Sequence, residues 1–521
     1  MRSGYHRGMN NVILKNGNMR IICSLFLLGV FLFNLVPIGL KACTTVIAGR
    51  NTTTDGSILF VKSEDDYEQL DYYWFIPRKR YGTDAVIFET RGLAIPQVSE
   101  TYAYFWDQSP KLEFSNVIIN EWGVAFGSNA CRSKEDPADV LEKRGDIVQG
   151  GIGFNLRFIL AERCKTAREA VLLAAALINR YGYNASGRCL NIVDPGEAWQ
   201  LQMVCGKHFV ARRVQDNEVA IIANTYNIRE IDIHDSANFI CSPDIIDYAI
   251  KRGWYDPAED GSFDFARAYA PDEVHKANGN THRTWMIARM LQKDFPLSLK
   301  NAENGQMPVS VKPDRKLALR DMINIFRNHY ENTELCTYMN ENISPHHVTN
   351  NPVCSYATHK VNIIQQRNWL PREIGTVNWR ALSHPCQSVF IPWYSGITRI
   401  PHAYQKAYED AGETDKARTA YHFSYPSWQL SYIDPESASC VFRLLNNIGD
   451  SRYTKNHELI RKYFDRLEAE LINKQAEIEK TASDLFNKDK NKATEFLTDY
   501  TNTCAMKGYR LAKDVLKKLL Q

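Results

Sequence analysis

The pattern of hydrophobic and polar positions predicts β-structure from residue 43 onward. Residues 43–49 are rich in β-branched side chains, the polar segment 53–56 ends in glycine, and residues 57–61 are apolar again. Two such runs around a short turn segment are typical of a β-hairpin. Residues 116–119 and 124–126, which flank Asn120–Gly123, predict a second hairpin.

Helical and further strand-like segments follow. Residues 154–181, with an apolar run over 170–178, indicate one helix or a pair of helices. Four more strands are expected at 190–193, 198–204, 209–214 and 219–222. Strands, then helices, then strands again predict a layered α+β protein in which helices cover antiparallel sheets.

The C-terminal part is predicted to be helical from about residue 455. Ile460, Phe464, Leu467 and Leu471 fall on one face of this helix, with charged residues between them. Such a stripe is expected to pack against the protein core rather than bind a partner. Since no Pro/Gly/Ser-rich linker divides the chain, we predict one domain over 43–450 and a helical segment, 451–521, packed on it.

Residues 1–42 have the pattern of a signal peptide. A basic stretch up to Arg20 precedes an apolar run over 21–40, and the small residue Ala42 follows. Cleavage after Ala42 would give an exported protein, periplasmic or extracellular. The alternative is an uncleaved membrane anchor, because about 20 apolar residues can span a bilayer. Asn34 and Pro37 interrupt the run and favour cleavage.

The charge and the cysteine content limit the classes of function that the chain can have. The formal net charge of the 521 residues is +3, but residues 1–42 contain five Lys/Arg and no Asp/Glu, so the remainder carries −2. This balance gives no reason to expect a nucleic acid as a partner. Of the 12 cysteines only Cys23 lies in the signal segment, and the odd number left indicates a reactive thiol. Disulfides among the others are permitted by an oxidising compartment.

No metal or cofactor is expected from the motifs. The chain has no CxxC pair, and the neighbouring His346 and His347 lack an HExxH frame. A Cys–His protease also needs a histidine partner that no motif identifies.

Cleavage after Ala42 would make Cys43 a self-contained nucleophile. The residue would then carry a thiol and a free α-amine, whose pKa of about 7.7–8.0 lets it accept the thiol proton. Two alternatives remain open: Cys43 is only the first residue of a strand, or Leu40–Cys43 is a bacterial lipoprotein signal, in which Cys43 is lipidated and its amine acylated. Lys41 is unusual in such a signal, and no flexible tether follows.

Several blocks resemble a known enzyme family. Cys43–Thr45, Asp55–Ser57, Lys62–Asp65, Asn120–Ala125 and Ser388–Gly396 occur in an order and spacing similar to the PepD-type cysteine dipeptidases. These are relatives of bile-salt hydrolases and penicillin V acylases in the N-terminal-nucleophile superfamily. The likeness extends over about residues 43–510. It implies an αββα four-layer sandwich with a helical C-terminal segment, and amide hydrolysis through a thioester.

The resemblance also assigns roles to individual residues. Lys62 matches a basic residue near the nucleophile, where a cation would depress the thiol pKa. Asp65 matches the carboxylate that orients the α-amine, whereas Glu64 and Asp66 are expected to be solvated. Asn224 matches the asparagine that donates to the oxyanion. Asn129 is a second oxyanion candidate, and Arg283 corresponds to a late active-site arginine.

The sequence thus predicts an exported dipeptidase acting on dipeptides or short peptides. An N-acyl amide hydrolase of the bile-salt or penicillin acylase type is the first alternative. A non-catalytic lipid-anchored or secreted binding protein is the second. Membrane contact is expected only through the signal peptide or a lipid anchor, and a homo-oligomer is left open.

Overall fold

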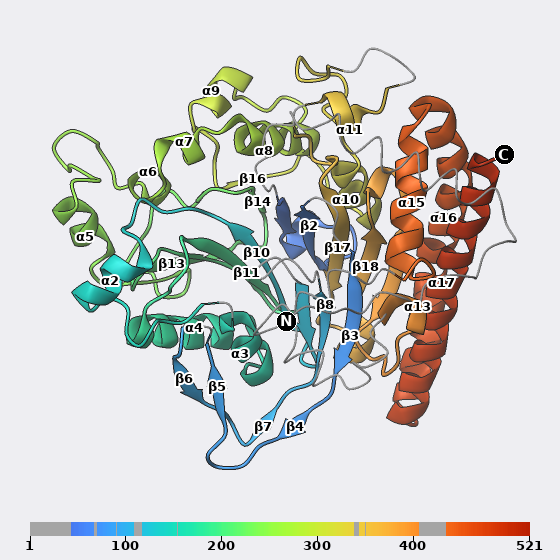
Figure 1. The fold of residues 1–521 in the computed structure, drawn as a ribbon, viewed down its shortest axis with the longest axis horizontal. Helices are drawn as coiled ribbons and strands as arrows, with labels where there is room; N and C mark the ends of the chain where they lie inside the picture. The colour runs from blue at the N-terminus through green and yellow to red at the C-terminus, as the bar shows by residue number, and fades with distance from the viewer. Residues whose placement is uncertain are drawn as a thin grey trace, which may run out of the picture. The chain divides into compact units, whose positions relative to one another are not determined.

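Two antiparallel β-sheets form the centre of the protein (Figure 1). The computed structural model describes residues 43–66, 70–89, 91–108, 117–153, 155–337, 343–349, 351–405 and 434–521. The predicted signal peptide, 1–42, lies outside these ranges. In the described part, the first sheet has the strand order β16-β14-β1-β2-β17-β18-β19, and the second has the order β15-β13-β12-β11-β10-β9-β8-β3.

The strands of the first sheet come from both halves of the chain. They are β1 (Thr45–Ala48), β2 (Ile58–Asp65), β14 (Val219–Ile222), β16 (Ser310–Val311), β17 (Thr358–Gln366), β18 (Thr376–Leu382) and β19 (Ile391–Tyr394).

The second sheet is more local in sequence. It contains β3 (Tyr72–Ile76), β8 (Tyr104–Gln108), β9 (Val117–Asn120), β10 (Ala125–Ala130), β11 (Arg188–Val193), β12 (Ala198–Met203), β13 (Phe209–Val214) and β15 (Phe239–Cys241). Two small ribbons pair β4 (Lys79–Arg80) with β7 (Glu100–Thr101), and β5 (Val86–Phe88) with β6 (Ala94–Pro96). Both predicted hairpins, β1–β2 and β9–β10, are confirmed.

Helices cover the outer face of each sheet. The second sheet packs against α3 (Leu156–Arg163) and α4 (Ala167–Tyr181), the predicted pair. The first packs against α8 (Asn278–Leu291), α10 (Leu319–Phe326), α15 (Ala438–Asp450), α16 (Tyr453–Phe486) and α17 (Lys490–Leu519). The shorter helices are α2 (Ala138–Arg144), α5 (Ile245–Lys251), α6 (Phe265–Tyr269), α7 (Asp272–His275), α9 (Leu299–Glu303), α11 (Pro345–Val348), α12 (Arg372–Gly375) and α13 (His402–Gln405), with 3-10 turns η1 (Arg50–Thr52) and η2 (Pro385–Gln387).

Separate apolar cores hold these layers together. Ile47 and Phe60 of the first sheet pack with Val117 and Ile119 of the second, which fills the space between the sheets. Two further cores join each sheet to its helices. Helices, two sheets and helices therefore follow one another, and the predicted αββα arrangement is confirmed.

Helix α4 shows how the sequence specifies one of these layers. Its N-cap residue Thr166 accepts a hydrogen bond from the Glu169 amide, which satisfies a backbone donor at the helix start. Ala170, Ala174 and Ile178 recur at helical spacing and are buried against the sheet. The predicted amphipathic pattern is therefore what docks the helix.

The C-terminal stripe also packs as predicted. Ile460, Phe464, Leu467 and Leu471 of α16 are buried in the core that joins the helices to the first sheet. Figure 1 shows α15, α16 and α17 side by side on that side of the molecule. The described residues between 43 and 521 form one compact unit. Among the described residues, no helix combines the length and apolarity that crossing a bilayer requires.

Candidate active site

Cys43 lies two residues before the start of β1, an inner strand of the first sheet. In this sheet Thr45 is paired with Lys62 of β2 on one side and with Ile222 of β14 on the other. Asn224 follows the end of β14, so the register brings it and Lys62 to the same end of β1 as Cys43.

Side chains at this end alternate between the two faces of the sheet, as a pleated strand requires. Thr45 Oγ1 donates to Asn129 Oδ1 of the second sheet (2.8 Å), so Thr45 points into the space between the sheets. Thr44 points the other way, where its hydroxyl accepts a hydrogen bond from Arg283 Nη1 of α8 (2.6 Å). The site therefore has an inner side, facing the second sheet, and an outer side, facing α8.

On the inner side, Cys43, Lys62 and Glu64 form a buried polar group. Cys43 Sγ lies 3.5 Å from Glu64 Oε2, and Lys62 Nζ lies 3.1 Å from Glu64 Oε1. Lys62 and Glu64 are fully buried, and Asp66 is 9% exposed. The prediction that Glu64 and Asp66 are solvated is wrong, because β2 continues through residue 65 and is flanked by strands on both sides.

Burial controls the protonation of the thiol. Removal from water raises the pKa of Cys43; Lys62 opposes this rise, and the carboxylates of Glu64 and Asp65 add to it. Burial works to lower the pKa of Lys62, but the charges of Cys43 and Glu64 outweigh it and the pKa is raised. Lys62 thus stays a cation and opposes the rise, but it does not by itself bring the thiol pKa below its ordinary value.

The Lys62–Glu64 pair gives a first testable prediction. Lys62→Met should reduce the free energy of unfolding by about 3–5 kcal/mol, because a buried carboxylate is left without its cation. The double variant Lys62→Met/Glu64→Gln should recover most of that loss in urea unfolding, yet stay less active, because the thiol has lost the cation beside it. A single variant as stable as the wild type would show that the pair is not required.

Asn224 faces the backbone nitrogen of Cys43. Its Oδ1 accepts hydrogen bonds from Cys43 N (2.7 Å) and from Arg283 Nη2 (3.0 Å). Because both partners are donors, they fix which end of the carboxamide is oxygen. The other end, Nδ2, is buried and has no hydrogen-bond partner among the described residues. An unpaired buried N–H donor is costly unless it serves a ligand, and it fits the oxyanion role predicted for Asn224.

Arg283 organises the outer side of the site. It is fully buried in α8 and donates to Thr44, Asn224 and the Gly279 carbonyl. Its Nη1 lies 3.9 Å from Asp65 Oδ2. The structure therefore brings Arg283 into contact with the neighbours of Cys43, and its predicted role in the active site stays a prediction.

Asp65 is held by two partners on this side. Thr358 Oγ1 of β17 donates to Asp65 Oδ1 (2.7 Å), and Arg283 faces the second oxygen. Burial raises the pKa of Asp65 to about 6, although Arg283 and Thr358 act to lower it. Its predicted role in orienting the α-amine stays a prediction.

The raised pKa of Asp65 predicts a pH dependence of stability. An acid with a higher pKa in the folded state binds its proton more tightly there, so stability falls as pH rises. The free energy of unfolding of the wild type, relative to Asp65→Asn, should fall between pH 3.8 and about 6. The fall should reach about 3 kcal/mol. Urea unfolding of both proteins over this range measures it; a difference that rises with pH would show that Arg283 outweighs burial.

Asn129 reaches Cys43 from the second sheet. Its Nδ2 donates to the Cys43 carbonyl (3.1 Å), and its Oδ1 accepts from Thr45 Oγ1 and from Asn191 Nδ2 (3.0 Å). These contacts position the Cys43 backbone. All six predicted site residues are thus within one connected network around Cys43.

Sequence reasoning missed several members of this network. Thr44, Ser63, Asn280 and Thr358 were not singled out, yet each hydrogen-bonds to another site residue or its backbone. For Ser63 a signal existed: residues 62–65 are four polar residues that continue an apolar strand run. In a strand buried on both faces, such residues must pair with one another.

The αββα sandwich is the fold class of the N-terminal-nucleophile hydrolases. The chain belongs to peptidase family C69, whose model matches residues 42–464, and the protein is therefore a peptidase. A curated relative from Salmonella dublin, named a probable dipeptidase, is 26% identical over 73% of this chain and 85% of its own. One from Latilactobacillus sakei, named likewise, is 25% identical over 71% and 77%.

More distant similarity extends to other proteins. A probable dipeptidase B from Streptococcus pyogenes serotype M1 is 24% identical over 75% of this chain and 78% of its own. Among solved structures, a mutant of the conjugated bile acid hydrolase from Clostridium perfringens aligns with 11% identity and a TM-score of 0.30, over 65% of this chain and 89% of that one. That score is too low to bear on fold or substrate.

Proposed function

We propose that the protein is an exported dipeptidase whose nucleophile is Cys43, the N-terminal residue once residues 1–42 are removed. The observation that carries the proposal is the hydrogen bond from Cys43 N to Asn224 Oδ1, since the site is built around the backbone nitrogen of this cysteine as well as its thiol. The names of the curated relatives support dipeptides as substrates.

In the first step the α-amine of Cys43 takes the thiol proton. The thiolate attacks the peptide carbonyl carbon and forms a tetrahedral oxyanion. The cations Lys62 and Arg283 disfavour a protonated amine and so keep it available as a base. Asn224 Oδ1 orients the amine, while its unpaired Nδ2 donates to the oxyanion.

In the second step the C–N bond breaks. The ammonium of Cys43 returns its proton to the leaving amine, which departs as the C-terminal amino acid, and a thioester links the remaining acyl group to Cys43. The neutral α-amine then activates a water molecule. The attack of this water molecule on the thioester releases the N-terminal amino acid and restores the thiol.

A substrate panel tests the proposal. Mature protein that begins at Cys43 is incubated with dipeptides and, in parallel, with N-acyl amides such as a bile-salt conjugate and penicillin V. Dipeptides are expected to be hydrolysed with the higher kcat/KM. Turnover of the N-acyl amides alone would contradict the dipeptidase assignment.

Asn224 allows the oxyanion role to be separated from the orienting role. Asn224→Ala should lower kcat by about 10²–10³-fold, the usual effect of losing one oxyanion donor. Asn224→Asp keeps an oxygen that can accept from Cys43 N but loses the N–H donor, so it should lose as much. The exposed Asn304→Ala serves as control. If Asn224→Asp retains activity in the same assay, the donor role is wrong.

A further inference from the structure

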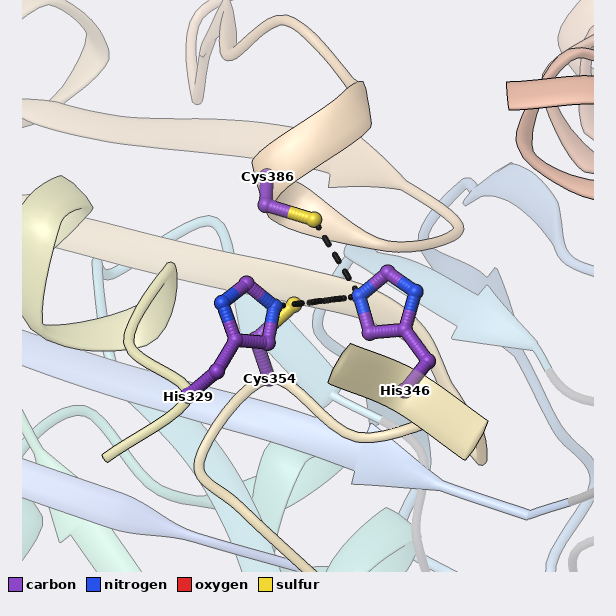
Figure 2. A group of neighbouring side chains, drawn as sticks. All are labelled: His329, His346, Cys354 and Cys386. Atoms are coloured by element: carbon purple, nitrogen blue, oxygen red, sulfur yellow. Dashed lines mark hydrogen bonds between the residues drawn. The ribbon is translucent and has the colours of Figure 1, made fainter. Parts of the chain in front are cut away.

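Two histidines and two cysteines meet at a buried point outside the predicted active site. His329 follows α10, His346 lies in α11, Cys354 precedes β17, and Cys386 lies in the turn η2. All four are buried. Figure 2 shows the two imidazole rings and the two thiols turned toward one another.

The distances within this cluster are close to those of a metal coordination shell. His346 Nε2 lies 3.1 Å from His329 Nε2, 3.2 Å from Cys386 Sγ and 3.6 Å from Cys354 Sγ. The four ligand atoms all lie within 4.8 Å of one another. A tetrahedral zinc with ordinary Zn–N and Zn–S bonds separates its ligand atoms by about 3.3–3.8 Å. The cluster therefore needs only small shifts to hold such an ion.

The outer nitrogens of both rings are already engaged by carboxylates. His329 Nδ1 lies 2.9 Å from Glu331 Oε1, and His346 Nδ1 lies 2.9 Å from Asp450 Oδ1. A carboxylate accepts only from a protonated Nδ1, which in a neutral ring leaves the Nε2 lone pair without a proton. Carboxylates behind metal-bound histidines commonly have this role.

This arrangement brings two lone pairs face to face. With both rings neutral, the two Nε2 atoms repel at 3.1 Å unless a cation lies between them. The cation is either a proton held by one ring or a metal ion. Two thiols at the same point favour the metal, because two sulfur and two nitrogen ligands are a typical tetrahedral zinc set.

We propose that His329, His346, Cys354 and Cys386 bind a structural Zn²⁺ ion. Binding releases the two thiol protons to solvent, and the two thiolates balance the charge of the ion. The resulting centre has no net charge, which limits the cost of holding it in a buried place. No motif in the sequence indicated a metal, because zinc motifs are recognised by pairs of ligands at short spacings. These four ligands come from four separate segments of the chain.

The ion would join the C-terminal helices to the first sheet, which carries the proposed nucleophile. Asp450, behind His346, is the last residue of α15, and Cys386 lies between β18 and β19. Cys354 leads into β17, whose first residue, Thr358, donates to Asp65. Because the four protein ligands complete a tetrahedral shell, no coordination position stays open for a substrate. A structural role is therefore expected rather than a catalytic one.

Metal analysis of untagged wild-type protein, purified without chelators, tests the proposal. About one zinc ion per chain is expected. Cys354→Ser and Cys386→Ser should each lose most of it, while Cys440→Ser, a cysteine of α15 outside the cluster, keeps it. Cys43→Ala should also keep it, which excludes zinc bound at the proposed nucleophile and makes the result independent of the proposed function.

A second measurement uses the wild-type protein alone, so that it does not depend on whether the cysteine variants fold. Wild-type protein freed of metal and reduced should take up Co²⁺ and show the thiolate-to-cobalt absorption of a tetrahedral site, and adding Zn²⁺ should raise its Tm. Absence of zinc together with no uptake of Co²⁺ would overturn the proposal. So would a Cys354–Cys386 disulfide in the native protein, found by mass spectrometry without reduction.

Discussion

Replacing Cys43 by alanine is expected to lower kcat/KM for a dipeptide by about 10⁴-fold or more, as the loss of a covalent nucleophile does in hydrolases. The substitution removes the thiol that forms the covalent bond to the substrate in the proposed mechanism. Because the contact of Cys43 Sγ with Glu64 is long, at 3.5 Å, and alanine still fills part of the site, the fold should survive the change. Steady-state kinetics of the purified mature variant measure the effect.

Two further variants show whether the loss of activity is specific to the thiol of Cys43. Cys241→Ala, which removes a half-buried thiol in β15 of the second sheet, should keep wild-type activity. Cys43→Ser keeps an attacking oxygen in place but with far lower acidity than a thiol, so only a small residual activity is expected. Full activity in Cys43→Ala would remove Cys43 from the mechanism altogether.

A single extra residue before Cys43 should have the second-largest effect. If the chain begins at Ala42, the nitrogen of Cys43 is an amide, whose lone pair is delocalised into the carbonyl group and cannot accept the thiol proton. Loss of the general base is expected to lower kcat by about 10²–10⁴-fold. The comparison uses two chains released from the same fusion partner, one starting at Ala42 and one at Cys43.

The two chains serve as controls for each other. Both keep the thiol, and the amide of the longer chain can still donate to Asn224 Oδ1, so their unfolding curves should match. Equal dipeptidase activity would show that a free N-terminus is not needed and that another group acts as the base.

The sequence predicted those parts of the fold that depend on local pattern. The β1–β2 hairpin, helix α4 and the stripe of Ile460 and Phe464 each carry a periodicity that identifies the element and its buried face. The αββα arrangement followed from the family resemblance rather than from these patterns. Pattern alone does not reveal that β14 and β17 flank the N-terminal hairpin, since those contacts join distant parts of the chain.

The same limit applies to the sites. Glu64 looked solvated because consecutive polar residues usually mark a surface turn, and only the pairing of β2 with β1 and β17 buries it. The cluster of His346 and Cys386 had no sequence signature, because its members meet only once the helices are packed on the sheet. Polar networks of this kind depend on tertiary contacts that short motifs do not encode.

The proposal that Cys43 is an N-terminal nucleophile is tested most directly by the mass of the N-terminal peptide of the mature protein, isolated from the cell that produces it. The expected result is a chain that begins at Cys43 with a free α-amine and an unmodified thiol. A diacylglyceryl group on Cys43 with an acylated amine, or a mature chain that begins at any other residue, would contradict it.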